Sequence, residues 1–115
     1  MHEVGLVAEL VDAAVERSGG RPVAVARVRR ATTIPDDVLR QAFEMLVPGT
    51  SLEGAMLHVE TFDVRLSCAC RFEGALEHDD VIGPSQAVCP GCSELRAIQP
   101  TAELELVEVR LRGVP

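Results

Sequence analysis

The first eighteen residues carry the clearest hydrophobic pattern in the chain. Apolar side chains recur there at intervals of three and four residues, which is the spacing of one face of an α-helix. These apolar positions are Val4, Val7, Ala8, Val11, Ala14 and Val15. The acidic positions on the opposite side are Glu9, Asp12 and Glu16. Since Gly19-Gly20 favours the end of a helix, the pattern predicts an amphipathic helix over residues 2–18.

Two shorter segments follow this helix. Residues 22–28 alternate in polarity, and a period of two residues predicts a β-strand. Residues 29–33 are interpreted as a connection. Pro35 is then expected to open a second helix, because an N–H group in the first helical turn has no partner and proline lacks that group. The Pro48-Gly49 pair ends this second helix.

Two further strands are predicted toward the C-terminus. Residues 54–66 form one long alternating segment, but its apolar phase changes between Val59 and Phe62, which predicts a bulge or a bend. Residues 103–112 alternate again and are expected to form the last strand. The order of elements predicts an α+β fold in which two helices pack on a small three-stranded sheet.

Composition narrows the class of function. The chain has 115 residues, enough for one domain or for one domain with a small appendage. Its 18 acidic residues outnumber its 11 basic residues, all of them arginine, and the net charge is −7. This acidic excess and the lack of Tyr and Trp disfavour binding to nucleic acid. With no apolar run long enough for a membrane and no basic leader segment, we expect a cytoplasmic protein.

Two cysteine pairs carry the strongest chemical signal. Cys89-Pro90-Gly91-Cys92 has two intervening residues, and its glycine permits the tight turn that lets both thiolates reach one tetrahedral ion. Cys68-Ala69-Cys70 has one intervening residue, a less favourable spacing that requires a different turn. In a reducing cytoplasm such pairs indicate a metal site before a disulfide. The sequence therefore predicts a zinc-ribbon-like domain, inserted before the last strand and held by these four cysteines.

Other interpretations of the cysteine region stay open at this point. The thiols could be reduced and free of metal, or one pair could form a reversible disulfide. His78 could replace one cysteine as a ligand, although a histidine in a loop is more often solvated. The nearby acidic residues Glu77, Asp79 and Asp80 are interpreted as a solvated loop tip. His58 is expected at the surface or at the edge of a sheet.

The first three residues, Met1-His2-Glu3, form a chelate when the α-amine is free. The amine, the backbone nitrogen of His2 and its imidazole can close adjacent rings around one ion. Glu3 can add its backbone nitrogen or its carboxylate. Nitrogen ligands in one plane suit Ni(II) or Cu(II) better than they suit zinc. The alternative interpretation is a solvated terminus without a function.

Several short motifs accompany these two candidate sites. They are Met1-His2-Glu3 on the first helix, Phe43-Glu44 on the second, Pro48-Gly49-Thr50, Glu53-Gly54-Ala55, and the two cysteine pairs before the last strand. In this combination the chain resembles, over essentially its whole length, the HypA/HybF family of hydrogenase nickel-incorporation proteins.

The resemblance implies a nickel metallochaperone. It assigns a nickel-binding α+β domain to residues 1–66 and 101–115, and a zinc-binding domain to residues 67–100. His2, with the amine of Met1 and the backbone nitrogen of Glu3, would bind Ni(II) as the transported ion. The ligands of a structural Zn(II) would be Cys68, Cys70, Cys89 and Cys92. The implied partners are a GTPase accessory protein and the large subunit of hydrogenase, and we expect a monomer or a weak dimer.

The chain departs from the family pattern at two places. The first cysteine pair has one intervening residue where the family usually has two, and Arg29-Arg30-Ala31 stands where the family often has Gly-Glu-Leu. The two arginines are expected to raise the positive potential near the nickel terminus. Asp36 or Asp37, at the start of the second helix, is a candidate to complete the nickel site.

Two other classes of function compete with the nickel carrier. One is a zinc-ribbon module that binds a protein partner and has no nickel role. The other is a thiol–disulfide switch at Cys89 and Cys92, which would need a reactive thiolate at the start of a helix. Neither of them needs His2 or a free amine. Catalysis is not expected, because the sequence shows no nucleophile–base pair and no phosphate-binding glycine loop.

Overall fold

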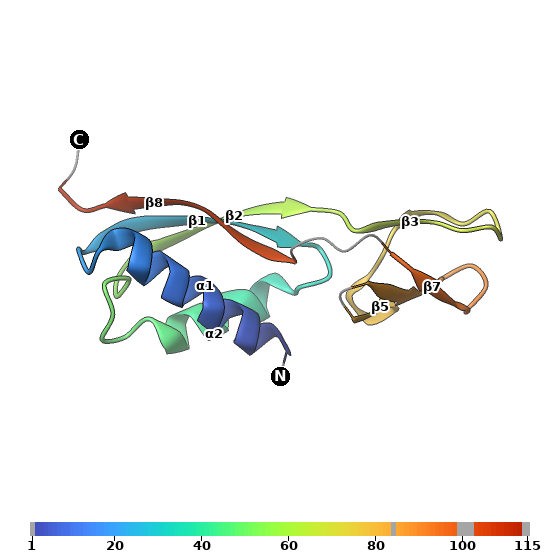
Figure 1. Cartoon of the computed structure of the whole chain (residues 1–115), viewed down its shortest axis with the longest axis horizontal. Coiled ribbons are helices and arrows are strands. Elements are labelled where there is room, and N and C mark those ends of the chain that lie inside the picture. The colour runs from blue at the N-terminus through green and yellow to red at the C-terminus, as the bar shows by residue number, and fades with distance from the viewer. Residues whose placement is uncertain (1, 84, 99–102, 114–115) are drawn as a thin grey trace.

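Two helices cover one face of a three-stranded sheet (Figure 1). The computed structural model describes residues 2–83, 85–98 and 103–113, and of His2 it describes the backbone alone. The elements of this layer are α1 (His2–Ser18), β1 (Val23–Ala31), α2 (Asp36–Leu46), β2 (Met56–Phe62) and β8 (Leu104–Leu111). The strand order is β2-β1-β8, with β1 parallel to β2 and antiparallel to β8.

The main core lies between the helices and this sheet. On β1, Ala26 and Val28 are fully buried, whereas Arg27 between them is half-buried on the other face. This alternation is what a strand with one covered face requires. The buried members of the core are Val7, Leu10, Val11, Ala14, Val23, Ala26, Val28, Ile34, Leu39, Ala42, Phe43, Val47 and Leu52.

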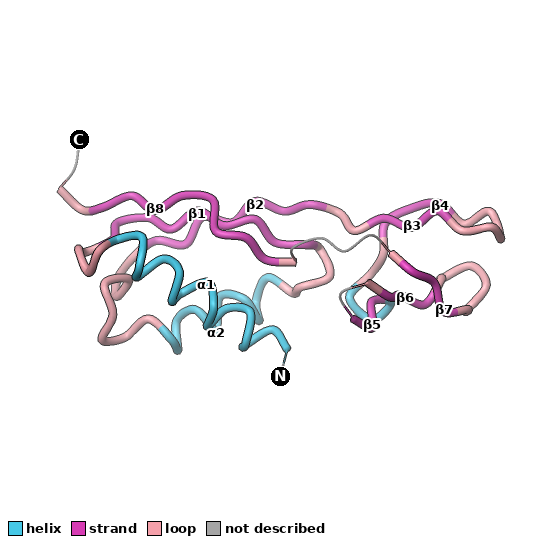
Figure 2. Tube along the Cα trace, viewed as in Figure 1, coloured by secondary structure: helices cyan, strands magenta, loops and turns pink. Residues whose placement is uncertain are grey.

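The cysteine region folds as a separate set of short strands beyond the end of β2 (Figure 2). Its elements are β3 (Arg65–Ser67), β4 (Glu73–Ala75), the 3-10 helix η1 (His78–Asp80), β5 (Val81–Gly83), β6 (Gln86–Val88) and β7 (Leu95–Ala97). β3 and β4 form an antiparallel ribbon, and β5, β6 and β7 form a small antiparallel sheet. Its own buried cluster has four members, Leu66, Leu76, Ala87 and Cys89.

The predicted fold class and element order are confirmed, and two local predictions are wrong. Residues 54–66 do not form one strand, because β2 ends at Phe62 and β3 begins at Arg65 with a different partner. The break between β2 and β3 comes just after the predicted change in the phase of the apolar residues, between Val59 and Phe62. Residues 29–31 are not a connection but the end of β1, where all three pair with β2 and the two arginines also pair with β8. His58 is exposed on the edge strand β2, as expected.

The arginines at the end of β1 are accommodated on opposite faces of the strand. Arg29 pairs with Glu105 at 3.8 Å, and its guanidinium lies 5.0 Å from the ring centroid of Phe62. Arg30 donates to the backbone oxygen of Ile34 and pairs with Asp36 at 3.6 Å. Charged residues can therefore continue this strand, since each face supplies partners for them.

In the described part of the chain, no helix has the length and apolar character needed to cross a membrane.

Candidate metal centres

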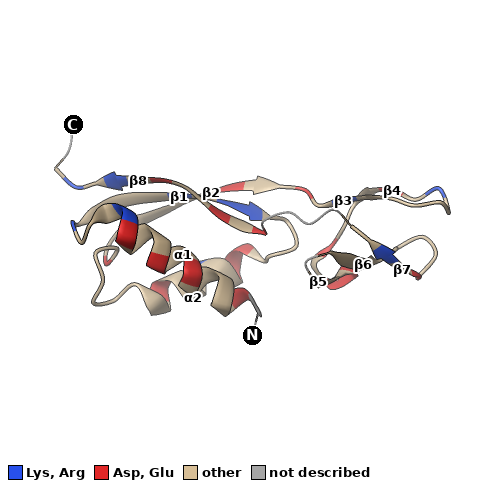
Figure 3. Ribbon diagram, viewed as in Figure 1, with Lys and Arg blue, Asp and Glu red and all other residues tan. Residues whose placement is uncertain are grey.

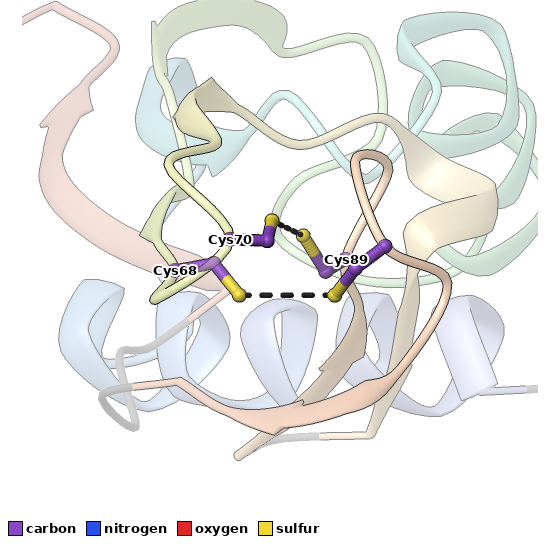
Figure 4. Close-up of side chains that lie close together, drawn as sticks. Cys68, Cys70 and Cys89 are labelled. Carbon is purple, nitrogen blue, oxygen red and sulfur yellow. Dashed lines mark hydrogen bonds between the residues drawn. The ribbon is translucent and has the colours of Figure 1, made fainter.

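Four cysteine sulfurs converge from two turns of the chain (Figure 4). Cys68 and Cys70 lie in the turn between β3 and β4, and Cys89 and Cys92 lie in the turn between β6 and β7. All four sulfurs lie within 4.8 Å of one another. Across the two turns, the sulfurs of Cys68 and Cys92 are 3.9 Å apart and those of Cys70 and Cys89 are 3.6 Å apart.

These distances suit a metal ion better than a disulfide. A tetrahedral ion with metal–sulfur bonds of about 2.3 Å holds its sulfurs about 3.8 Å apart. A disulfide would bring two of them to about 2.05 Å, and all four cysteines are free. His78 does not belong to the cluster, which among the described residues consists of the four cysteines. The residues present therefore fit a four-thiolate site for zinc, and the possibility that His78 replaces a cysteine is not supported.

Both turns close in a similar way despite their different lengths. In the first turn, the N–H of Arg71 donates to the carbonyl of Cys68 at 2.9 Å. In the second turn, which is one residue longer, the N–H of Ser93 donates to the carbonyl of Cys89 at 2.8 Å. Arg71 and Ser93 have positive φ angles of 79° and 62°. Each turn thus reverses through a left-handed residue directly after its second cysteine, and the first turn does so with one intervening residue instead of two.

Backbone N–H groups in the first turn point at sulfur. The N–H of Cys70 donates to the thiol of Cys68 and is the largest reason why the pKa of Cys68 falls to about 6. The N–H of Phe72 lowers the pKa of Cys70, but burial and the neighbouring thiols outweigh it and raise that pKa to about 11. Opposite shifts in adjacent thiols are expected where one negative charge disfavours another nearby. A divalent cation among the sulfurs would relieve this repulsion.

The second candidate centre lies where α1 begins. Met1 and the side chain of His2 lie outside the described residues, so the structure describes only the surroundings of the predicted chelate. The first N–H groups of a helix have no partner within the helix, which leaves the backbone nitrogens of His2 and Glu3 without intrahelical bonds. The carboxylate of Glu3 is 24% exposed, and its Oε1 lies 3.6 Å from Nε2 of His78.

His78 joins the cysteine region to the start of α1. Its Nδ1 hydrogen-bonds to the backbone oxygen of Thr33. Because a carbonyl only accepts, Nδ1 carries the proton, and Nε2 is the ring nitrogen that faces Glu3. A backbone carbonyl on the other ring nitrogen is the usual support of a metal-binding histidine. Helical or strand periodicity could not reveal this contact, since 75 positions along the chain separate His78 from Glu3.

A cavity of about 510 Å³ opens at this junction. Its lining residues are Glu3, Thr33, Ile34, His78, Asp79, Val81, Ile82, Gly83 and Glu103. Acidic residues lie on both sides of the junction, at the start of α1 and around β5 (Figure 3). Thr33 is 3% exposed, and its hydroxyl oxygen is buried without a hydrogen-bond partner among the described residues. The cavity therefore offers carboxylate and imidazole groups to a small polar ligand or cation.

Neither of the two aspartates considered for the predicted nickel site points to the start of α1 as a free ligand. Asp36 pairs with Arg40 at 2.9 Å and with Arg30 at 3.6 Å. Asp37 is exposed in the first turn of α2, and neither aspartate lines the junction cavity. The positive charges of Arg29 and Arg30 are each opposed by a carboxylate, so their effect on the potential at the terminus is smaller than the sequence alone indicates.

Comparisons with known proteins agree on one family. The family model described as "Hydrogenase/urease nickel incorporation, metallochaperone, hypA" matches residues 1–111. The chain is 28% identical to the hydrogenase maturation factor HypA of Methanothermobacter thermautotrophicus over 98 residues, which is 80% of each chain. It is 29% identical to the protein of the same name from Thermomicrobium roseum, in an alignment covering 97% of this chain and 98% of the relative.

Solved structures show the same fold. The solution structure of the nickel metallochaperone HypA from Helicobacter pylori superimposes with a TM-score of 0.58 at 18% identity, and covers 95% of this chain and 96% of that one. A second solution structure of a HypA protein gives a TM-score of 0.56 at the same identity. At this identity the likeness concerns the fold alone.

Proposed function

Because the chain belongs to the HypA family of hydrogenase and urease nickel-incorporation metallochaperones, we propose that it binds Ni(II) and delivers it during the maturation of nickel–iron hydrogenase. In this role the chain acts as a carrier and not as a catalyst. Nickel is the cargo, and a structural zinc ion stays with the protein. The partners proposed are a GTPase accessory protein and the large subunit of hydrogenase.

Nickel is proposed to bind at the start of α1. The proposed ligands are the amine of Met1, the backbone nitrogens of His2 and Glu3, and the imidazole of His2, a set of nitrogen donors that suits planar Ni(II). The observation that carries the proposal is the placement of His78. It brings a second imidazole to the start of α1, with Nε2 at 3.6 Å from the Glu3 carboxylate and Nδ1 bonded to a backbone oxygen.

Zinc is proposed to bind to Cys68, Cys70, Cys89 and Cys92. The spacing of their sulfurs supports this assignment. The bound ion would stabilise a region whose buried cluster has only four members. The presence of two separate buried clusters supports assigning residues 1–66 and 101–115 to nickel and residues 67–100 to zinc.

Zinc in this region would also hold His78 against the start of α1, because η1 lies between β4 and β5 of the same unit. A planar site built partly from a chain terminus can be dismantled when a partner competes for one ligand. Protonation of an imidazole would weaken it as well. These two properties let a carrier hold nickel and still release it.

Isothermal titration of the zinc-loaded protein with Ni(II) tests the proposal. The protein with its native N-terminus is compared with H2A, with an N-terminally extended form and with H78A. H58A is the matched control, since His58 is an exposed histidine on the edge strand β2. We expect one tight site that is lost in H2A and in the extended form, is weakened about tenfold or more in H78A, and is unchanged in H58A.

The same titration also distinguishes the nickel carrier from the competing function. A zinc-loaded native protein that shows no nickel site would refute the carrier and favour a zinc-ribbon module that binds a protein partner. If nickel binds tightly and H78A behaves like H58A, the terminus alone forms the site and His78 has no part in it.

A further inference from the structure

Strand β2 forms an open edge of the main sheet. In the described part of the chain its one neighbouring strand is β1, since the strand order is β2-β1-β8. The pairing of β2 with β1 runs without a shift in register, whereas the pairing of β8 with β1 is irregular at two places. Irregular pairing hinders the addition of a further strand, and β2 also lacks the lysine and proline that commonly block an edge. The edge of β2 can therefore accept another strand.

Backbone groups of alternate residues point out of the sheet along this edge. The carbonyl of Phe62 faces β1, because it accepts a hydrogen bond of 2.8 Å from the N–H of Thr32, just after the end of β1. The N–H and C=O groups of neighbouring residues in a strand point to opposite sides. Those of Leu57, Val59 and Thr61 therefore point away from β1 and are directed at the open edge.

Arg40 of α2 covers this edge at one point. Its Nη1 lies 3.5 Å from the carbonyl oxygen of Leu57, which agrees with the outward direction of that carbonyl. This hydrogen bond is long, and the same guanidinium pairs more closely with Asp36, at 2.9 Å. An N–H group of an added strand can therefore replace Arg40 at Leu57 without breaking the ion pair with Asp36.

The sequence of β2 is complementary to itself in the antiparallel direction. When two copies pair about a two-fold axis at Val59, His58 of one copy lies opposite Glu60 of the other, and Met56 lies opposite Phe62. An imidazole opposite a carboxylate and a thioether opposite an aromatic ring are both favourable cross-strand pairs. By symmetry each pair occurs twice. In the single chain His58 is exposed and Met56 is 67% exposed.

The backbone groups match about the same axis. The outward groups of Val59 meet those of Val59 in the second copy, and the outward groups of Leu57 meet those of Thr61. Residues that stand opposite each other with their N–H and C=O groups facing are the hydrogen-bonded pairs of an antiparallel ladder. The axis that pairs the side chains therefore also pairs the backbone.

We propose that the edge of β2 is a dimerisation surface, at which a second copy of this chain pairs antiparallel about a two-fold axis at Val59. The two three-stranded sheets join into one continuous sheet, and the helices of both copies lie on the same face of it. This surface uses none of the proposed metal ligands, so the inference goes beyond the proposed function and does not depend on it.

Sedimentation equilibrium of the zinc-loaded, full-length protein measures the dissociation constant of the dimer. The protein is examined at rising concentration up to its solubility limit. T61P tests the backbone pairing, because the N–H of Thr61 points away from β1 and its loss removes no hydrogen bond within the sheet. T61A keeps this N–H and is the matched control. We expect T61P to raise the dissociation constant about tenfold or more, since the dimer loses two hydrogen bonds, and T61A to leave it unchanged.

A second set of variants tests the register. H58E places two carboxylates opposite each other at two symmetric positions, which should weaken the dimer about tenfold. H58E/E60Q removes the opposing charge and should restore much of the association. Q86E adds the same negative charge at an exposed position of β6 and is the control, expected to behave as the wild type.

The outcomes separate the surface from the register. A wild type that stays monomeric at every concentration overturns the proposal, and so does a dimer that neither T61P nor H58E weakens. A dimer weakened by T61P but not by H58E overturns the axis at Val59. If T61P does not fold, H58E and its rescue by E60Q decide: loss and recovery of the dimer support the surface, and their absence overturns it.

Discussion

Gly91 and Cys70 come from different turns and pack directly against each other. A Cβ atom at Gly91 would lie 3.1 Å from the sulfur of Cys70 and 3.0 Å from the Cβ of Phe72. Both distances are shorter than ordinary van der Waals contacts. The glycine of the second cysteine pair is therefore needed by the first pair, because its missing side chain lets the two turns pack closely together.

The variant G91A is accordingly expected to hold zinc less well. The added methyl group must displace Cys70 or Phe72, and overpacking of this kind costs about 1–3 kcal/mol. This loss of stability should appear as a lower midpoint of thermal unfolding and as faster zinc loss to a chelator. G83A is the control, because a Cβ at Gly83 meets nothing within 4 Å. Equal zinc retention in G91A and G83A would contradict the packing argument.

Arg71 provides the opposite test, because replacing it with glycine should stabilise the folded protein. Its φ of 79° places a residue with a side chain in the left-handed region, which costs about 1–2 kcal/mol, whereas glycine is free to adopt it. Glycine is also more flexible in the unfolded chain, which offsets part of this gain. The free energy of unfolding of R71G should therefore exceed that of the wild type by about 0.5–1 kcal/mol. Thermal unfolding of the zinc-loaded proteins measures the gain.

The control for this substitution is R65G, in which glycine replaces an exposed arginine of strand β3. That change should destabilise the protein, because glycine weakens a regular strand. A drop in stability for both variants would mean that the backbone at Arg71 is not strained.

Removal of the metal should affect the two parts of the molecule differently. The cysteine region buries four residues in its own cluster, too few to fold unaided, whereas the larger core lies between the helices and the main sheet. After chelation, amide hydrogen exchange should accelerate throughout β3 to β7 and stay slow in β1. The far-ultraviolet circular dichroism of α1 and α2 should persist. Unchanged exchange in β3 to β7 would show that this region needs no metal.

The sequence was sufficient for everything that depends on local period or spacing. Helical spacing located α1, and the proline at position 35 located the start of α2. The change of phase after Val59 marked the place where β2 gives way to β3. The two cysteine pairs are close enough along the chain to indicate a shared site. Each of these inferences concerns residues separated by a few positions or by a motif of known spacing.

Contacts between distant residues were not accessible in this way. The approach of His78 to Glu3 depends on how the cysteine region folds back toward α1. The extension of β1 through Arg29 and Arg30 depends on partners from β2, β8 and α2. Likewise, the left-handed backbone of Arg71, through which the chain reverses after Cys70, cannot be deduced from the spacing of Cys68 and Cys70. Composition and period do not encode any of these.

The last prediction concerns Arg27, which crosses the open face of the sheet. Its guanidinium bonds to Glu60 of β2 at 2.6 Å and to Glu108 of β8 at 2.8 Å. Hydrogen bonds from Arg27 lower the pKa of Glu60, and those from Arg110 and Arg27 lower the pKa of Glu108. A carboxyl whose pKa is lower in the folded chain adds stability above its unfolded pKa and loses it as the pH falls through the folded pKa.

The wild type should therefore be more stable than R27Q at neutral pH, and the difference should shrink as the pH falls below about 4, where glutamates become protonated. Urea unfolding at several pH values measures this difference in the free energy of unfolding. High salt at neutral pH should also reduce the difference, because these partly exposed charges are screened. R65Q, on the ribbon away from this face, controls for loss of an arginine. A gap between wild type and R27Q that is independent of pH would assign the role of Arg27 to packing of its side chain.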